Sequence, residues 1–142
     1  MTENFVKEVK NNFGDKIKKV FEKSKKRVYV DVNSCDVPEV IRFLITALKG
    51  RFAIATGIDT FRGIELLYHI SFDRTGLVFS VRTVLDGKSP KIQSLTPEMK
   101  VFEWIEREIH ELLGVEFTGH PNPEHLLLID DWPEGKFPLK KE

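Results

Sequence analysis

Apolar residues recur at helical spacing in three stretches of the chain. The first helix is expected over residues 5–13, where aromatic and aliphatic side chains lie four residues apart. A second is expected over residues 36–50, because an Asp, a Pro in the first turn and a Glu three residues on open it, and a Gly closes it. The third is a long helix near residues 97–113, with Thr96 as its cap and Pro97 at its first position. Its apolar stripe is predicted to be Phe102, Ile105, Ile109 and Leu112.

Other stretches alternate between apolar and polar residues, which is typical of strands with one buried face. Residues 52–58 predict one such strand. Residues 64–72 and 77–82 predict a hairpin around the turn at residues 73–76, with its apolar side chains on one face. An antiparallel sheet backed by helices would bury that face.

Residues 17–32 fit two structures. The apolar positions near residue 20 could continue a helix, whereas Val28, Val30 and Val32 alternate as in a strand. A glycine inside a helix is costly, so Gly14 favours a hairpin of residues 17–22 and 27–32 over one long helix.

The order of these elements predicts an α+β fold: a two-layer helix/sheet domain with a mostly antiparallel sheet, over residues 1–114. Periodicity fails in residues 115–142, which are rich in Pro and Gly yet carry several large apolar side chains. So much apolar surface is rarely left in water. We therefore expect an irregular, extended C-terminal docking segment, part of which contacts a partner protein, rather than an independent domain.

Composition and charge narrow the class of protein. The 22 Lys and Arg residues balance the 22 Asp and Glu residues, which removes a general electrostatic attraction to nucleic acid or to an anionic membrane. Cys35 is the only cysteine, so no internal disulfide can form, and a reducing, cytoplasmic setting is the simplest interpretation. No apolar run approaches the length of a membrane span. The many Lys and Glu residues resemble the composition of thermophile proteins.

The residues that could carry chemistry do not form a catalytic or metal-binding pattern. His110, His120 and His125 lack the spacing and the cysteine ligands of a zinc site, so structural roles are predicted for them. Glu106 and Glu108 cannot act as a carboxylate pair, because residues two apart on a helix point in different directions.

The third helix is rich in acidic residues. Glu103, Arg107 and Glu111 are spaced four apart and would form a row of ion pairs along one face. That row is either solvated surface or, because Glu106 and Glu108 add more negative charge, a face that an Arg or Lys of a partner completes.

Several motifs in the last forty residues occur in the order and spacing of a known family. The motifs are Glu106-Arg107-Glu108, Glu111, Gly114, Gly119-His120-Pro121, Asp130-Asp131-Trp132 and Pro138-Leu139-Lys140-Lys141, with Ser94-Leu95-Thr96 leading into the helix. On these motifs the chain resembles the 30 kDa subunit of respiratory complex I and its relatives in membrane-bound nickel-iron hydrogenases, and its segment after His120 is closer to the hydrogenase-type branch. Four positions depart from the family pattern: His110 replaces an aromatic residue, Glu111 and Glu142 each replace Asp, and Lys140 replaces Arg.

The resemblance implies a non-catalytic scaffold subunit in the peripheral cytoplasmic arm of a membrane-bound, energy-converting oxidoreductase complex. A protein of this kind has no cofactor and no metal, packs against the hydrogenase-like large subunit near the iron-sulfur small subunit, and meets the membrane only through the complex. A respiratory NADH:quinone oxidoreductase subunit of the 30 kDa type is one alternative, and a stand-alone α+β ligand-binding module or enzyme is another. The residues expected to bind the partner are Glu106, Arg107, Glu108, Glu111, Gly119, His120, Pro121, Asp130, Asp131, Trp132, Pro138, Leu139, Lys140 and Lys141.

Overall fold

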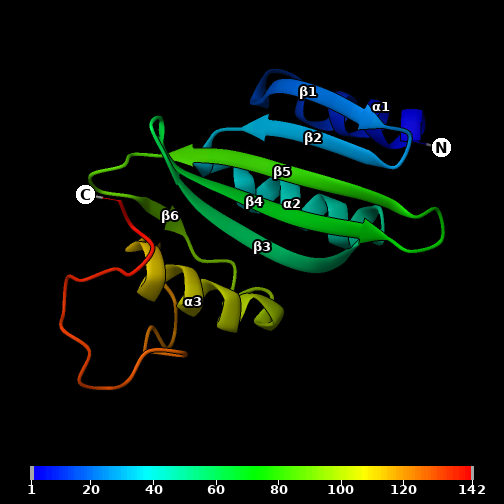
Figure 1. Ribbon diagram of the computed structural model, residues 1–142. Coiled ribbons are helices and arrows are strands. Elements are labelled where there is room, and N and C mark those ends of the chain that lie inside the picture. Colours follow the sequence, from blue (N-terminus) through cyan, green and yellow to red (C-terminus); the bar gives the residue numbers. More distant parts are fainter. Residues whose placement is uncertain (1, 142) are drawn as a thin grey trace. The chain divides into compact units, whose positions relative to one another are not determined.

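The computed structural model describes residues 2–141 and confirms the α+β fold class (Figure 1). The chain divides into two compact units. The first runs up to Ala55 and includes Leu66–Thr83, and the second consists of Thr56–Glu65 and the residues from Val84 onward. The segment after residue 114, which the sequence predicts as a docking segment, lies in the second unit together with the third helix.

Within residues 2–141, seven strands form two sheets. The larger sheet has the strand order β1-β2-β5-β4-β3, and the smaller one pairs β6 with β7 in parallel. In the larger sheet β1 and β2 are antiparallel, and β2 and β5 are parallel. The strands are β1 (Ile17–Ser24), β2 (Arg27–Val32), β3 (Arg51–Thr60), β4 (Gly63–Phe72), β5 (Leu77–Leu85), β6 (Lys91–Gln93) and β7 (Glu116–Thr118).

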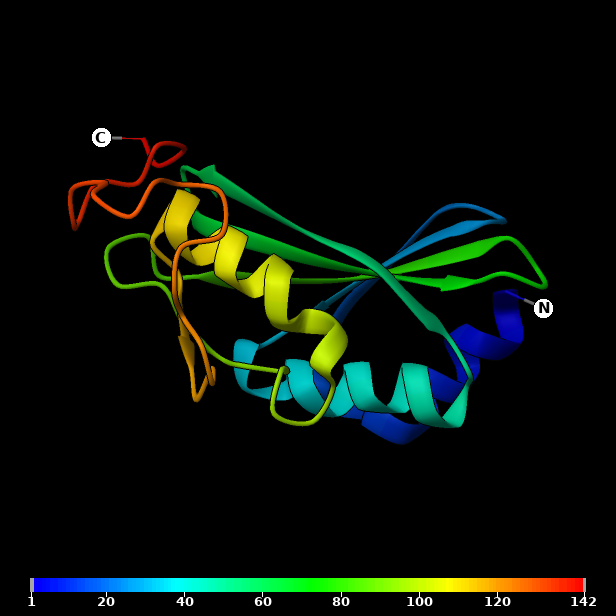
Figure 2. The same ribbon diagram turned by 90° about the horizontal axis from the view of Figure 1, so that it is seen from below.

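In the first unit, helices cover one face of the sheet (Figure 2). These are α1 (Thr2–Phe13) and α2 (Val37–Arg42), and α2 continues as one turn of π-helix over Phe43–Ala47. The core between the layers is aliphatic and aromatic, and the alternation predicted for residues 64–72 and 77–82 is confirmed. The core side chains that are fully buried include Val28, Val30, Val40, Ile41, Leu44, Leu66, Ile70, Phe79 and Val81.

Residues 17–32 form the hairpin that the sequence favoured over a long helix. Val20 pairs with Val30 and Phe21 with Tyr29 across the two antiparallel strands. Because neighbouring strand residues point to opposite faces, the valines of β2 are buried while Phe21 is 52% exposed.

Three details of the helices and strands differ from the sequence-based expectation. Asp36 precedes α2 but makes no capping hydrogen bond with its side chain. In β3 the buried residue is Ala55, whereas Ile54 and Ile58, which the alternation suggested as an apolar face, are 54% and 45% exposed. The short strands β6 and β7 were not predicted, since three residues are too few to show a period.

The third helix, α3 (Glu103–Leu113), begins later than expected and buries a different stripe. A turn follows Thr96, and a 3-10 turn over Lys100–Phe102 leads into the helix, so Thr96 is not its cap. The fully or nearly buried positions are Phe102, Glu106, Ile109, Glu111 and Leu113, rather than the predicted stripe with Ile105 and Leu112. Two carboxylates therefore occupy buried positions of α3. Within residues 2–141, no helix combines the length and apolarity needed to cross a membrane.

Candidate functional site: the tail bound to helix α3

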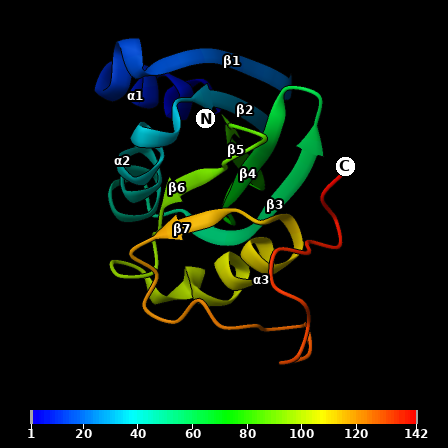
Figure 3. The same cartoon turned by 90° about the vertical axis from the view of Figure 1, so that its left-hand side faces the viewer.

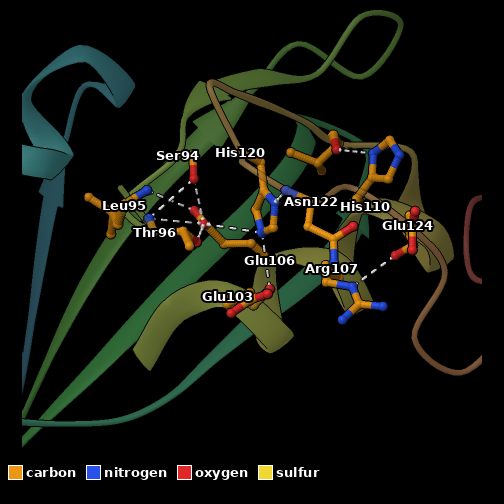
Figure 4. Close-up of polar contacts among 11 residues, drawn as sticks. Ser94, Leu95, Thr96, Glu103, Glu106, Arg107, His110, His120, Asn122 and Glu124 are labelled. Carbon is orange, nitrogen blue, oxygen red and sulfur yellow. Dashed lines mark hydrogen bonds and ion pairs between the residues drawn. The ribbon is translucent and has the colours of Figure 1, made fainter. Parts of the chain in front are cut away.

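The carboxylate of Glu106 binds the segment that precedes α3 (Figure 4). Its side chain points from the first turn of α3 and is 1% exposed. The hydroxyl of Ser94 donates to Oε1 at 2.7 Å, and the backbone N–H of Leu95 donates to Oε2 at 2.9 Å. Thr96 adds its N–H, at 3.3 Å from Oε1, and its hydroxyl. These donors satisfy a buried charge that would otherwise be costly.

His120 lies beside this carboxylate and fixes the start of the tail. Its side chain is 2% exposed, and its Nε2 is 3.9 Å from Oε1 of Glu106, which is too long for a hydrogen bond. The N–H of Asn122 donates to Nδ1 at 3.0 Å, so the ring proton lies on Nε2, which donates to the carbonyl of Glu103 at 3.1 Å. The imidazole thereby joins the loop after β7 to the first turn of α3.

Glu111 and Arg107 hold the middle of the tail through its backbone. The Glu111 carboxylate is 3% exposed and accepts three consecutive backbone N–H groups, from Leu126 at 3.0 Å, Leu127 at 2.6 Å and Leu128 at 3.3 Å. Arg107 donates from Nε to the carbonyl of Glu124 at 2.9 Å and from Nη2 to the carbonyl of His125 at 2.7 Å. One helix therefore binds a stretch of irregular chain that has no strand partner for these groups.

The end of the tail returns to the end of α3. Gly114 ends the helix with φ 76°, and a Cβ at this position would lie 2.7 Å from the ring of Phe137. The N–H of Leu139 donates to the carbonyl of Leu112 at 2.9 Å, and that of Lys141 donates to Asp59 Oδ2 at 2.6 Å. Figure 3 shows the tail running beside α3 for much of its length.

The three tail-region histidines are all engaged with backbone carbonyls. His110 Nδ1 lies 2.8 Å from the carbonyl oxygen of Val115, and His125 Nδ1 lies 3.0 Å from that of Ile129. His120 binds Glu103 as described above. Among residues 2–141, no cluster of three or more His, Cys, Asp or Glu side chains has the arrangement of a metal site. The contacts between α3 and the tail therefore order the tail and leave part of it exposed as a surface.

That surface is apolar and acidic. Leu127, Ile129 and Leu139 are 63%, 65% and 58% exposed. An open hollow of about 730 Å³ lies between the end of α3 and the tail, and Glu111, Asp130 and Trp132 are among the residues that line it. The indole N–H of Trp132 donates to the carbonyl of Lys136 at 2.9 Å, which closes the loop around this hollow.

The structure separates the predicted partner-binding residues into two sets. The side chains of Glu106, Arg107, Glu111 and His120 join α3 to the segment before it or to the tail. The interpretation of Glu106 as unneutralised surface acid is wrong, because it is buried among donors. Arg107 and Glu111 bind tail backbone, so the expected row of ion pairs is replaced by backbone contacts. The rest are partly or fully exposed, and partner binding stays a prediction for them: Glu108, Gly119, Pro121, Asp130, Asp131, Trp132, Pro138, Leu139, Lys140 and Lys141.

The donors to Glu106 were missed as functional residues by reasoning from periodicity. Ser94 and Thr96 are buried, 4% and 6% exposed, and they lie in the segment between β6 and the 3-10 turn that leads into α3. The sequence shows two hydroxyl residues and, ten residues after Thr96, a Glu. That spacing has no helical or strand period, so it does not identify Ser94 and Thr96 as donors to Glu106.

The fold and the site define a small α+β protein with a structured C-terminal tail bound to one helix. The chain belongs to the family of the 30 kDa subunit of respiratory-chain NADH dehydrogenase, whose family model matches residues 30–142. The resemblance inferred from the motifs is thereby confirmed.

Relatives from several kinds of oxidoreductase are similar to this chain. Formate hydrogenlyase subunit 5 of Escherichia coli is 31% identical over 84% of this chain, but the match spans only 22% of that relative. A subunit of the F(420)H(2) dehydrogenase of Methanosarcina mazei is 33% identical over 82% of this chain and 73% of its own length. A subunit of the NADH-quinone oxidoreductase of Moorella thermoacetica is 31% identical over 93% of both chains.

Two solved structures share the fold. A chain in the structure of the membrane-bound sulfane sulfur reductase, an archaeal respiratory membrane complex, superposes with a TM-score of 0.83 at 21% identity, over 96% of this chain and 81% of that one. The trypsin-resistant fragment of Nqo5 superposes with a TM-score of 0.69 at 19% identity, over 86% of this chain and 99% of that one.

Proposed function

We propose that this chain is a non-catalytic scaffold subunit of the peripheral cytoplasmic arm of a membrane-bound, energy-converting oxidoreductase complex. It packs against the hydrogenase-like large subunit near the iron-sulfur small subunit, carries no cofactor, and meets the membrane only through the complex. Membership of the 30 kDa subunit family supports a role inside such a complex.

The observation that carries the proposal is the difference in length between this chain and some of its relatives. Formate hydrogenlyase subunit 5 and hydrogenase-4 component G match this chain over 22% and 20% of their own lengths. Two relatives from NADH-quinone oxidoreductases also bear the names of two subunits within one chain. In such relatives the region like this chain is covalently joined to a much longer region, which fits a stable association between the two.

The hydrogenase-type branch is favoured over a respiratory NADH:quinone oxidoreductase. Two of the relatives, formate hydrogenlyase subunit 5 and hydrogenase-4 component G, bear hydrogen-linked names. The segment after His120 also resembles the hydrogenase-type branch more than the respiratory one. The site also fits a scaffold, because its two buried carboxylates are engaged with the chain itself: Glu106 binds the segment before α3, and Glu111 binds backbone N–H groups of the tail.

Co-purification tests the proposal. The tagged full chain is co-expressed with the chain from the same genome that matches the unmatched remainder of formate hydrogenlyase subunit 5, and the membrane fraction is extracted in mild detergent. We expect the two chains to co-elute at a one-to-one ratio, and elemental analysis of the tagged chain alone to find no bound metal. A stable, metal-loaded and partner-free monomer would contradict the proposal and favour a stand-alone module.

A further inference from the structure

The run Leu126–Ile129 is apolar throughout, yet its side chains do not share one environment. Leu126 and Leu128 are half-buried, whereas Leu127 and Ile129 are 63% and 65% exposed. The Glu111 carboxylate holds the backbone of this run. It accepts three consecutive N–H groups, so the backbone curls around it, and along the run half-buried and exposed side chains alternate.

We propose that Leu127 and Ile129, a pair named here the hydrophobic plug, insert into an apolar recess with a basic rim on the hydrogenase-like large subunit. The inference rests on the proposed function and specifies the contact through which it operates. Two large aliphatic side chains exposed on neighbouring alternate positions of a loop are the kind of anchor that fills a pocket at the centre of an interface.

The charges around the hydrophobic plug define the rim of its binding partner. Within residues 124–136 four exposed acidic residues surround it in sequence, against one exposed Lys or Arg, Lys136. Three of them also line the hollow beside Trp132, where a lysine or arginine of the partner lies against these carboxylates and an indole. The four are Glu124, Asp130, Asp131 and Glu134.

The same charges argue against a second copy of this chain as the occupant. A symmetric contact through the hydrophobic plug would bring two acidic rims together, and like charges across an interface are repulsive. A recess in a different chain with lysine or arginine at its edge has no such cost.

The hydrophobic plug is also held in place before any partner binds. Glu111 fixes three amides, Arg107 fixes the two carbonyls that precede them, and the ring of His125 lies 3.0 Å from the carbonyl oxygen of Ile129. A preformed loop loses little conformational freedom on association, so its apolar contacts contribute more of their free energy to affinity.

The test measures the affinity of the purified full chain for the purified large subunit by calorimetry. We expect the double variant Leu127→Ala/Ile129→Ala to bind about a hundredfold more weakly, since two buried aliphatic side chains are truncated. The matched control is Ile54→Ala/Ile58→Ala, which removes two similarly exposed side chains from β3 and is expected to change affinity by less than about twofold. An equal loss in both variants would overturn the assignment.

A second variant tests the role of Glu111 without touching the apolar surface. Glu111→Gln keeps the shape of the side chain but replaces one acceptor oxygen with an NH2 group, which cannot accept. At least one of the three hydrogen bonds is therefore lost, and we expect the amide resonances of Leu126, Leu127 and Leu128 to shift. Affinity for the large subunit is expected to fall about tenfold as the loop loses its fixed conformation. Shifted amides with unchanged affinity would separate the loop from binding and overturn this step.

The outcomes distinguish the inference from the function on which it rests. If the wild-type chain does not bind the large subunit, the proposed function fails. If it binds and the double variant binds equally well, the hydrophobic plug is wrong and the scaffold role stands. If the wild-type chain self-associates and the double variant does not, the occupant is a second copy of this chain.

Discussion

The two units of the molecule use acidic side chains in different ways. In the first unit Asp73 pairs with Arg51 at the surface, where the side chains are 60% and 61% exposed. In the second unit Glu106 and Glu111 are 1% and 3% exposed, and each accepts several backbone or hydroxyl donors. The surface pair adds to a structure that apolar packing already determines, whereas the buried carboxylates determine the path of the chain around them.

The difference follows from what the backbone lacks in each unit. The first unit consists mainly of helices and strands, whose N–H and C=O groups pair with one another. The segments at residues 95–96 and 126–128 belong to no helix or strand, so their N–H groups need acceptors outside a helix or sheet. Glu106 and Glu111 are such acceptors, and each binds adjacent N–H groups. In this chain the irregular segments are held by hydrogen bonds to buried carboxylates rather than by the backbone hydrogen bonds of a sheet or helix.

Removing the first buried carboxylate is expected to have the largest effect. Glu106→Ala removes the buried acceptor of the Leu95 N–H and of the Ser94 and Thr96 hydroxyls, so we expect a loss of about 3–5 kcal/mol in the free energy of unfolding. Urea denaturation followed by circular dichroism measures it. The control Glu108→Ala removes a half-exposed carboxylate of the same helix and should cost less than about 0.5 kcal/mol. Similar costs for the two variants would contradict the contrast between buried and surface acids.

Two glycines of the second unit separate the effect of backbone conformation from that of the tail contact. Gly114 and Gly119 both have positive φ, of 76° and 83°, but a Cβ on Gly114 would meet the ring of Phe137, while a Cβ on Gly119 would meet nothing within 4 Å. Each Gly→Ala change should cost about 1–2 kcal/mol for the left-handed conformation. Gly114→Ala should also displace the ring and expose the N–H of Leu139 to faster hydrogen exchange.

Exchange at Leu139 is the measurement that decides between the two causes. If the Leu139 N–H exchanges faster in Gly114→Ala but not in Gly119→Ala, the cause is the lost contact with Phe137. Equal acceleration in both variants would mean that the end of the tail depends on general stability rather than on its packing against Gly114.

The sequence predicted the first unit better than the second for a physical reason. The hairpin at residues 17–32 and the strands around residue 70 bury one face each, and that burial produces the alternation from which they were predicted. In α3 the same logic misplaced the buried stripe, because Glu106 occupies one of its positions and a pattern of apolar residues omits a glutamate. The tail motifs were identified through the family resemblance, but hydrophobic spacing contains no information on which backbone groups a carboxylate binds.

The smallest expected effect concerns the surface pair of the first unit. Arg51 donates to both carboxylate oxygens of Asp73, at 2.8 and 3.0 Å, and Ser71 donates to one of them at 2.7 Å. The hydrogen bonds from Arg51, followed by that from Ser71, lower the pKa of Asp73 from 3.8 to about 2. Because the folded-state pKa is the lower one, the pair stabilises the fold fully above pH 3.8, and this contribution is lost as the pH falls through 2.

Carboxyl NMR titration of the folded chain between pH 5 and pH 2 tests that sign directly, with the pH range set by the two pKa values of Asp73. In Arg51→Met we expect the pKa of Asp73 to rise toward 3.8 while the midpoint of urea unfolding at neutral pH changes little, since both side chains are largely solvated. If the midpoint of urea unfolding shifted as much in Arg51→Met as in Glu106→Ala, this surface pair would also determine the path of the backbone. The distinction between the two units would then rest on regularity of the backbone and not on burial of the charge.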